Sequence, residues 1–323
     1  MEQPLLFPSL EAAVPAESLL EFRSDVEFRE LASRRALNRY RGGRMPFTYT
    51  LNPYRGCEFG CGYCYARYTH EYLGRERQEA WEREILVKTE LAQALRAELR
   101  PGLLCGQEIA IGTATDPYQP AERRYGVTRS VLEELARHRG LSVSITTKSP
   151  LVVRDLDVLR TLDERGELSI QVSLISLDRH LLRRLEPRAP TPERRLWAIE
   201  RLAAAGLRVG LFLMPILPAI VDRPAALDAL VRRAAEAGAR FVVPDTLFLR
   251  SSARRSFLPI VERDFPDHAD RYHRWYHRSA YAPAEYRQRV RRLVRRLARK
   301  YGLGGGRTRA EGDAGGGQLA LPL

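Results

Sequence analysis

Apolar and polar positions change their spacing repeatedly along this chain, and the changes predict alternating strands and helices. Runs rich in β-branched and apolar residues predict strands at 47–51, 108–113, 142–147, 168–174, 207–214 and 240–244. Helical patterns lie between them, near 63–72, 82–99, 128–138, 152–164, 192–205 and 224–237. Such alternation indicates parallel βα units, so we predict an α/β fold built as a partial (β/α)6 TIM-like barrel. Its active site is expected at the carboxyl ends of the strands.

The chain ends follow a different pattern from the barrel region. We predict four parts: an irregular or helical N-terminal lead-in at 1–45, the partial barrel at 46–260, a basic and aromatic helical extension at 261–301, and a flexible glycine-rich tail at 302–323. Within the extension, Val290, Leu293, Val294 and Leu297 form one apolar helical stripe.

Composition and charge narrow the function classes. At 44% hydrophobic residues the chain can bury a core, which excludes a mainly disordered protein. No apolar run reaches the roughly 18 residues of a membrane span, and no signal sequence opens the chain, so we expect a soluble cytoplasmic protein with no membrane partner. The formal net charge of +13 suits a polyanionic partner such as nucleic acid. The arginine bias is equally typical of a GC-rich genome or a hot habitat.

Three of the four cysteines lie within eight residues, as Cys57, Cys61 and Cys64. This spacing indicates a metal site in a reducing compartment rather than a disulfide framework. Structural zinc usually has four protein ligands, and the fourth cysteine, Cys105, is distant. Three thiolates on a tight loop suit a [4Fe–4S] cluster with one iron left without a protein ligand. A zinc site completed by a distant residue and three unrelated buried thiols are the alternatives.

The spacing Cys-x3-Cys-x2-Cys directly after the first predicted strand resembles the radical S-adenosylmethionine (SAM) superfamily, and Tyr63 just before the last cysteine strengthens the match. The flanking segments Asn-Pro-Tyr-Arg-Gly-Cys and Tyr-Cys-Tyr-Ala-Arg resemble the spore photoproduct lyase-like branch. The resemblance covers about residues 45–250. It implies a cluster held by the three cysteines, SAM bound at the open iron, and a 5′-deoxyadenosyl radical that abstracts a hydrogen atom.

The resemblance also suggests which residues bind SAM. Tyr63 would lie against the adenine, Asp116 and Lys148 would contact the amino and carboxylate groups, and Ser173 would contact the ribose or carboxylate. Each has a structural alternative: a core aromatic, an Asp-Pro turn, a solvated lysine at a strand end, and a structural serine.

The hydrogen donor that would complete a lyase reaction is not evident from the sequence. The cysteine that serves a spore photoproduct lyase would align near Thr113, where this chain has no cysteine. Cys105 precedes the strand and is expected nearer the opposite end of the barrel, as a structural thiol or in a redox role. Tyr118 is a weak catalytic candidate for the donor.

We expect the substrate to be a nucleic acid base, with DNA lesion reversal by a lyase-like reaction as the leading function in DNA repair. Tyr272, Trp275 and Tyr276 would stack on bases, or would simply pin a solvated helix. Expected partners are DNA, a reducing electron donor such as flavodoxin or ferredoxin, and a bacterial sliding clamp bound by the terminal peptide Gln318–Leu323. The alternatives are radical SAM modification of RNA or a peptide, and a non-enzymatic iron–sulfur protein that binds nucleic acid or senses redox state.

Overall fold

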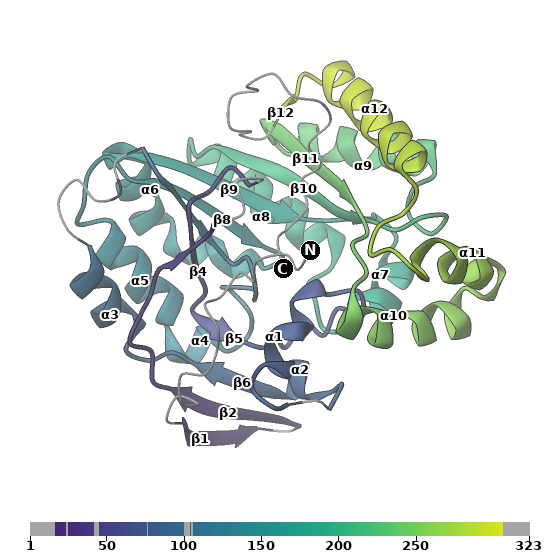
Figure 1. Ribbon diagram of the computed structural model, residues 1–323. Coiled ribbons are helices and arrows are strands. Elements are labelled where there is room, and N and C mark those ends of the chain that lie inside the picture. The colour runs from purple at the N-terminus through teal and green to yellow at the C-terminus, as the bar shows by residue number, and fades with distance from the viewer. Residues whose placement is uncertain are drawn as a thin grey trace.

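The computed structural model describes residues 17–23, 25–41, 45–75, 77–99, 104 and 106–305. At its centre lies a sheet in the order β12-β11-β10-β9-β8-β7-β4-β3 (Figure 1). Its six main strands run parallel to one another: β4 (Tyr49–Leu51), β7 (Glu108–Ile111), β8 (Ser142–Thr147), β9 (Glu167–Ser173), β10 (Val209–Ile216) and β11 (Phe241–Thr246). They lie within two residues of the predicted bounds, which confirms the predicted partial barrel.

Helices join the strands, and the longer ones among them cover the outer face of the sheet (Figure 1). They are η1 (Tyr65–Arg67), α1 (Tyr68–Glu71), α2 (Ala80–Arg83), α3 (Leu91–Glu98), α4 (Glu122–Tyr125), α5 (Val127–Leu135), η2 (Pro150–Asp155), α6 (Leu156–Arg165), α7 (Arg179–Leu185), α8 (Pro192–Ala204) and α9 (Pro224–Glu236). In α9, for example, Leu227, Leu230, Val231 and Ala234 form a buried stripe. Packing of such stripes on the apolar strands forms the core.

The N-terminal region differs from the prediction of an irregular or helical lead-in. Strands β1 (Glu17–Arg23) and β2 (Val26–Leu31) form an antiparallel pair. Strand β2 then pairs with β6 (Glu84–Val87), which also pairs with β5 (Tyr54–Arg55), so a second small sheet lies beside the barrel. A further short strand, β3 (Asn38–Arg39), borders β4.

Strand β6 also interrupts the helix predicted over 82–99. Its Ile85, Leu86 and Val87 have no exposed surface. A short, continuous apolar run does not distinguish a buried strand from a buried helix by its period, so the pattern misled the prediction. This segment forms a strand because it pairs with β2, which is distant in sequence.

Three helices form the C-terminal region: α10 (Ser251–Asp264), α11 (Pro266–Tyr276) and α12 (Ala284–Lys300). Helical structure therefore begins ten residues before the predicted boundary at 261. The predicted stripe on α12 is present, with Val290, Val294 and Leu297 buried and Leu293 packed against the core.

The aromatic residues of α11 do not form the base-stacking surface that we considered. Tyr272 and Tyr276 are fully buried, and their hydroxyls donate to the carbonyls of Pro218 and Leu247. Trp275 is half-buried against Tyr286. These rings pin α11 to the barrel, as the alternative interpretation had it.

The beginning of the predicted glycine-rich tail is structured. Strand β12 (Gly304–Gly305) pairs with β11. The rest of the tail, including the candidate clamp-binding peptide Gln318–Leu323, lies outside the described residues, and so does Cys105. None of the helices in the described chain is both long and apolar enough to cross a membrane.

Candidate active site

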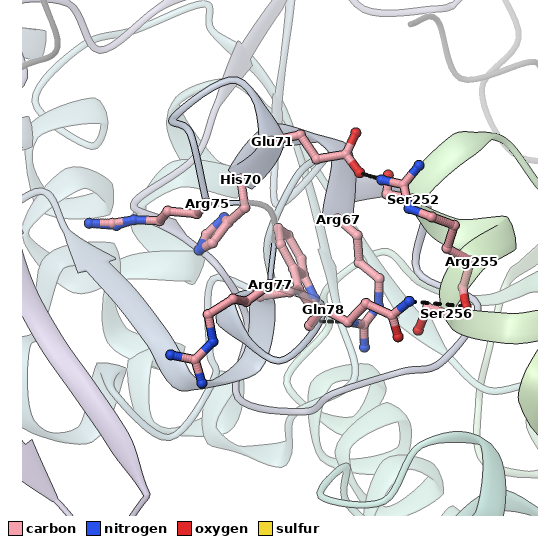
Figure 2. Close-up of a pocket in the computed structure, with 10 residues that line it drawn as sticks. Arg67, His70, Glu71, Arg75, Arg77, Gln78, Ser252, Arg255 and Ser256 are labelled. Atoms are coloured by element: carbon pink, nitrogen blue, oxygen red, sulfur yellow. Dashed lines mark hydrogen bonds and ion pairs between the residues drawn. The ribbon is translucent and has the colours of Figure 1, made fainter.

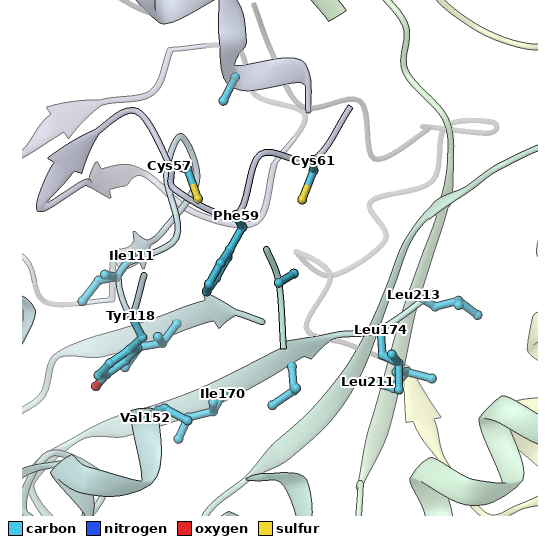
Figure 3. Close-up of a cluster of buried hydrophobic side chains, with 14 of the residues drawn as sticks. Cys57, Phe59, Cys61, Ile111, Tyr118, Val152, Ile170, Leu174, Leu211 and Leu213 are labelled. Atoms are coloured by element: carbon cyan, nitrogen blue, oxygen red, sulfur yellow. The ribbon is translucent and has the colours of Figure 1, made fainter. Parts of the chain in front are cut away.

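The cysteine loop lies between β5 and η1, close after the first parallel strand. Cys57 and Cys61 are buried, Cys64 is half-buried, and none of the three is in a disulfide. In Figure 3 the sulfur atoms of Cys57 and Cys61 lie on the same side of the loop, with Phe59 between them reaching toward the buried face of the sheet. The structure therefore holds these two thiols over the barrel core.

Backbone contacts with two distant segments fix the loop. The amide of Cys57 donates to the Trp81 carbonyl at 2.9 Å, and the amide of Gly62 donates to the Leu185 carbonyl at 3.0 Å. Gly56 has a φ of +79°, and a Cβ there would lie 2.9 Å from two backbone oxygens. Only glycine fits this position without displacing backbone. At Gly56 glycine therefore allows the loop to pack closely against the backbone of residues 81–84.

Gln119, which is fully buried, ties the loop to the segment after β7. Its Oε1 accepts from the Glu58 amide at 2.9 Å, and its Nε2 donates to the Gly56 carbonyl at 3.1 Å. The Thr115 hydroxyl also donates to the Gly56 carbonyl, at 2.6 Å. Sequence analysis did not identify Gln119, because nothing local indicates a contact across more than sixty residues.

Arg67 holds the loop from the other side. It is buried, and its Nε and Nη2 donate to the Cys61 carbonyl at 3.3 and 3.2 Å. Its Nη1 donates to the Gln78 carbonyl at 3.0 Å and lies 2.9 Å from the Glu82 carboxylate. All three guanidinium nitrogens are therefore engaged, so Arg67 acts as a rigid brace of the loop.

The surroundings keep the three thiols protonated in the absence of a metal. Burial raises the pKa of Cys61 to about 12, although Lys148 opposes the shift. Burial also raises the pKa of Cys57 and of Cys64. Thiolates here need a bound cation to compensate for lost hydration, as iron or another metal ion provides.

The described residues include no three His, Cys, Asp or Glu side chains close enough to hold one metal ion together. Three cysteines on one tight loop suit a [4Fe–4S] cluster, in which each thiolate binds a different iron.

Asp116 and Lys148 lie together beside the cysteine loop. The Asp116 carboxylate accepts from the Thr147 hydroxyl at 2.6 Å, from the Lys148 amide at 2.7 Å and from the Tyr118 amide at 2.9 Å. Asp116 thus joins the ends of β7 and β8 and fixes the backbone of Lys148.

The Lys148 ammonium lies over the Tyr63 ring, 6.0 Å from its centroid. Burial alone would lower the pKa of Lys148, but the acidic groups around it outweigh burial and hold the pKa above its ordinary value: Cys61 once it is ionised, Glu186 and Asp116. The side chain is therefore a charged ammonium at neutral pH. Its half-buried position leaves it available to an anionic group.

Tyr63 belongs to a buried polar network that sequence analysis missed. Its hydroxyl donates to Glu186, and the other oxygen of Glu186 pairs with Arg195, which has no exposed surface. Arg195 also donates to the carbonyls of Pro190 at 2.8 Å and Ser173 at 3.0 Å. The edge of the Tyr63 ring packs on Phe257, with centroids 6.1 Å apart. The segment 186–192, which begins with Glu186 and contains three prolines, is thus part of the site.

Ser173 and Tyr118, the remaining predicted residues, are both buried. The Ser173 hydroxyl has a long contact of 3.5 Å to the Met214 carbonyl, and its own carbonyl joins the network through Arg195. The ring of Tyr118 packs near Ile111 and Val152, and its hydroxyl points away from Cys57 and Cys61 (Figure 3). This orientation does not suit a hydrogen donor to the site.

A second cluster of polar residues surrounds Thr113, which lies just after the end of β7. The Tyr65 hydroxyl donates to the Thr113 carbonyl, and the Asn52 amide donates to the Thr113 hydroxyl at 3.2 Å. The buried Lys88 donates to the Asn52 carbonyl at 2.8 Å, and burial lowers its pKa to about 7. Tyr65 and Lys88 therefore reach the end of the barrel that carries the cysteine loop.

Comparison with known proteins agrees with this geometry. The model of the radical SAM superfamily matches residues 51–230. An uncharacterized protein of Mycobacterium tuberculosis is 39% identical over 281 residues, which cover 87% of this chain and 82% of that protein. An uncharacterized protein of Methanocaldococcus jannaschii is 25% identical over 228 residues, 68% of this chain and 77% of that protein.

Solved structures of spore photoproduct lyase share the fold. One is a complex with dinucleoside spore photoproduct, with a TM-score of 0.60, 16% identity, and coverage of 85% of this chain and 80% of the other. A mutant with bound AdoMet and dinucleoside spore photoproduct has a TM-score of 0.54 and 17% identity. The match covers 80% of this chain and 75% of the other. The superfamily uses a [4Fe–4S] cluster and SAM. The chain therefore belongs to the radical SAM superfamily.

Proposed function

We propose that this radical SAM enzyme acts on a nucleic acid base in the cytoplasm, with lyase-like reversal of a DNA lesion as its leading reaction. Cys57, Cys61 and Cys64 would bind the cluster. The observation that carries the proposal is the cysteine loop, braced by Gln119 and Arg67 at the carboxyl ends of the parallel strands. An external reductant such as flavodoxin or ferredoxin would supply the electron.

When bound, the cluster and SAM would supply the radical chemistry of the superfamily, which is hydrogen-atom abstraction from the substrate. The chain's own residues orient SAM. The Lys148 ammonium would hold the carboxylate of SAM, and Asp116 would position Lys148 through its backbone amide. Tyr63 offers a ring beside that ammonium for the adenine. Ser173 would act mainly through its carbonyl, which orients Arg195.

Two observations support a nucleic acid substrate. The net charge of +13 favours a polyanion. The spore photoproduct lyase that shares this fold was solved with a dinucleoside lesion bound. Thr113 lies where a lyase cysteine would align, and an alcohol is a poor hydrogen-atom donor, so the cycle of this enzyme would end differently from one that uses a thiol.

The first test is anaerobic incubation of the reduced holoenzyme with SAM. Formation of 5′-deoxyadenosine is expected, and it should disappear in Cys61→Ala, whereas Arg160→Gln, at an exposed position on α6, should leave it unchanged. An intact cluster that yields no 5′-deoxyadenosine would favour the non-enzymatic sensor instead.

The second test concerns the substrate. Deuterated DNA oligonucleotides carrying defined lesions should transfer label to 5′-deoxyadenosine. Transfer only from labelled RNA or peptide would identify the alternative reactions. Binding to DNA should also weaken as salt rises, and a flat salt response would contradict phosphate contacts.

A further inference from the structure

A basic pocket lies beside the cysteine loop, to which Arg67 of its lining is bonded. It is formed where η1 and α1, which follow the first parallel strands, contact α10, which follows β11. Segments that follow the first and the last strand of the six-stranded run thus lie side by side here (Figure 1). Ten residues line the pocket: Arg67, His70, Glu71, Arg75, Arg77, Gln78, Trp81, Ser252, Arg255 and Ser256 (Figure 2).

Positive charge dominates this lining. Four arginines face the pocket and one acid, Glu71, which pairs with Arg255. Arg67 and Arg75 pair with Glu82 and Glu84 outside the lining. These three pairs leave the charge of the fourth arginine uncompensated.

Arg77 is that fourth arginine. Its side chain is exposed, and within the described residues its guanidinium has no hydrogen bond or ion pair. It can therefore turn toward an anion at the mouth of the pocket without giving up an existing partner.

Buried donors without partners also line the pocket. Trp81 is 2% exposed, and its indole N–H has no hydrogen-bond partner in the described chain. Ser252 is 8% exposed, and its hydroxyl likewise lacks one. Leaving a buried donor unsatisfied costs free energy, so such groups point to a ligand. Ser252 also stands in the first turn of α10, where unpaired backbone N–H groups favour an anion.

His70 also lines the pocket with an unpartnered nitrogen, Nδ1, but this atom is not a donor. Its Nε2 lies 2.9 Å from the Glu84 carbonyl and therefore carries the proton, while burial lowers its pKa to about 4. In the neutral ring Nδ1 is an acceptor and contributes nothing to anion binding. The donors are thus Arg77, Trp81 and Ser252.

We propose that this pocket binds a phosphate group, and that the phosphate belongs to the backbone of the nucleic acid substrate. The second part rests on the proposed function. A tetrahedral anion would satisfy the indole and hydroxyl donors together and neutralise Arg77. Arg67 connects the pocket to the Cys61 carbonyl, so a backbone phosphate bound here would lie one side chain away from the cysteine loop. The pocket would thereby set the register of the strand beside the reaction centre.

The test uses the anaerobic holoenzyme and three variants. Ser252→Ala removes a hydroxyl that no protein group uses, and Arg77→Gln removes the unpaired charge. Arg160→Gln removes an exposed arginine on α6 and serves as the matched control. Equilibrium dialysis with radiolabelled orthophosphate and fluorescence anisotropy with a DNA oligonucleotide at several salt concentrations give the two binding constants. SAM cleavage without substrate should be the same in all four proteins.

We expect Ser252→Ala to weaken both kinds of binding about tenfold. Arg77→Gln should weaken oligonucleotide binding and lower its salt slope by about one. Weakened orthophosphate binding with unchanged oligonucleotide binding would overturn the assignment to substrate backbone but keep the phosphate site. If the enzyme binds no nucleic acid, the proposed function fails and the orthophosphate measurement alone decides the pocket. Unchanged binding of both ligands in both variants would overturn the inference.

Discussion

Replacing Glu186 by glutamine tests the buried network behind Tyr63. The amide keeps an oxygen for the Tyr63 hydroxyl but removes the charge that pairs with Arg195. Arg195 would retain the carbonyls of Pro190 and Ser173, yet its cation would lie fully buried without a counter-charge. Breaking a buried ion pair in this way costs about 3–5 kcal/mol. For a chain of 323 residues we expect Tm to fall by about 4–7 °C.

Urea unfolding of the anaerobic protein would measure the loss, and a second variant would identify its cause. Adding Arg195→Met to Glu186→Gln removes the orphaned cation, so the double variant should regain at least half of the lost free energy of unfolding. Arg195 and Lys148 hold the pKa of Glu186 below its ordinary value although burial opposes them. The difference between wild type and Glu186→Gln should therefore persist above about pH 4.3 and fade as the pH drops further. A single variant within 1 kcal/mol of wild type, or additive losses in the double variant, would refute the reasoning.

Three further substitutions test other contacts of the site. Lys148→Met should weaken SAM binding about tenfold or more by equilibrium dialysis and leave iron content unchanged; equal affinity would remove Lys148 from the site. Gln119→Leu should lower the free energy of unfolding by about 2–4 kcal/mol and reduce iron bound per chain, and unchanged iron and stability would show that the loop needs no such clamp. Because burial lowers the pKa of Lys88 to about 7, the unfolded chain binds more protons than the folded one from pH 7 to about 10.4, and stability rises with pH across that range. Lys88→Met should therefore lower the slope of stability against pH by up to about 1.4 kcal/mol per pH unit in urea unfolding, and parallel curves would contradict a buried ammonium.

The parallel sheet could be predicted because each strand is a short apolar run between helical patterns. Residues 142–147, for example, match β8 at both ends. The small second sheet could not be predicted in the same way. Its β6 joins β2, more than fifty residues earlier, and such pairing leaves no periodic trace in either segment. Tertiary contact overrode the local pattern there.

The residues of the candidate site likewise fall into those that the sequence identifies and those that only tertiary contacts reveal. The three cysteines are recognisable because cluster ligands must be close in sequence to share one tight loop. Gln119 and Glu186 are not, because each reaches the cysteine loop from more than sixty residues away, and Arg195 on α8 acts by pairing with Glu186. A glutamine or an ion pair in a loop normally belongs to the surface, and only burial shows that these residues fix the cysteine loop and Tyr63.

The basic excess of the chain supports a polyanionic partner only in part, because α12 uses much of its charge for its own packing. Lys300 pairs with Asp228 at 2.7 Å, and Arg291 lies 3.7 Å from Asp245. Arg287 and Arg289 lie over tyrosine rings. The exposed arginines of this helix that have no such contact in the described chain are Arg292, Arg295, Arg296 and Arg299. Charge that is paired within the protein attracts phosphate less strongly, so the charge argument for nucleic acid rests on these four and on Arg77 of the pocket beside the cysteine loop.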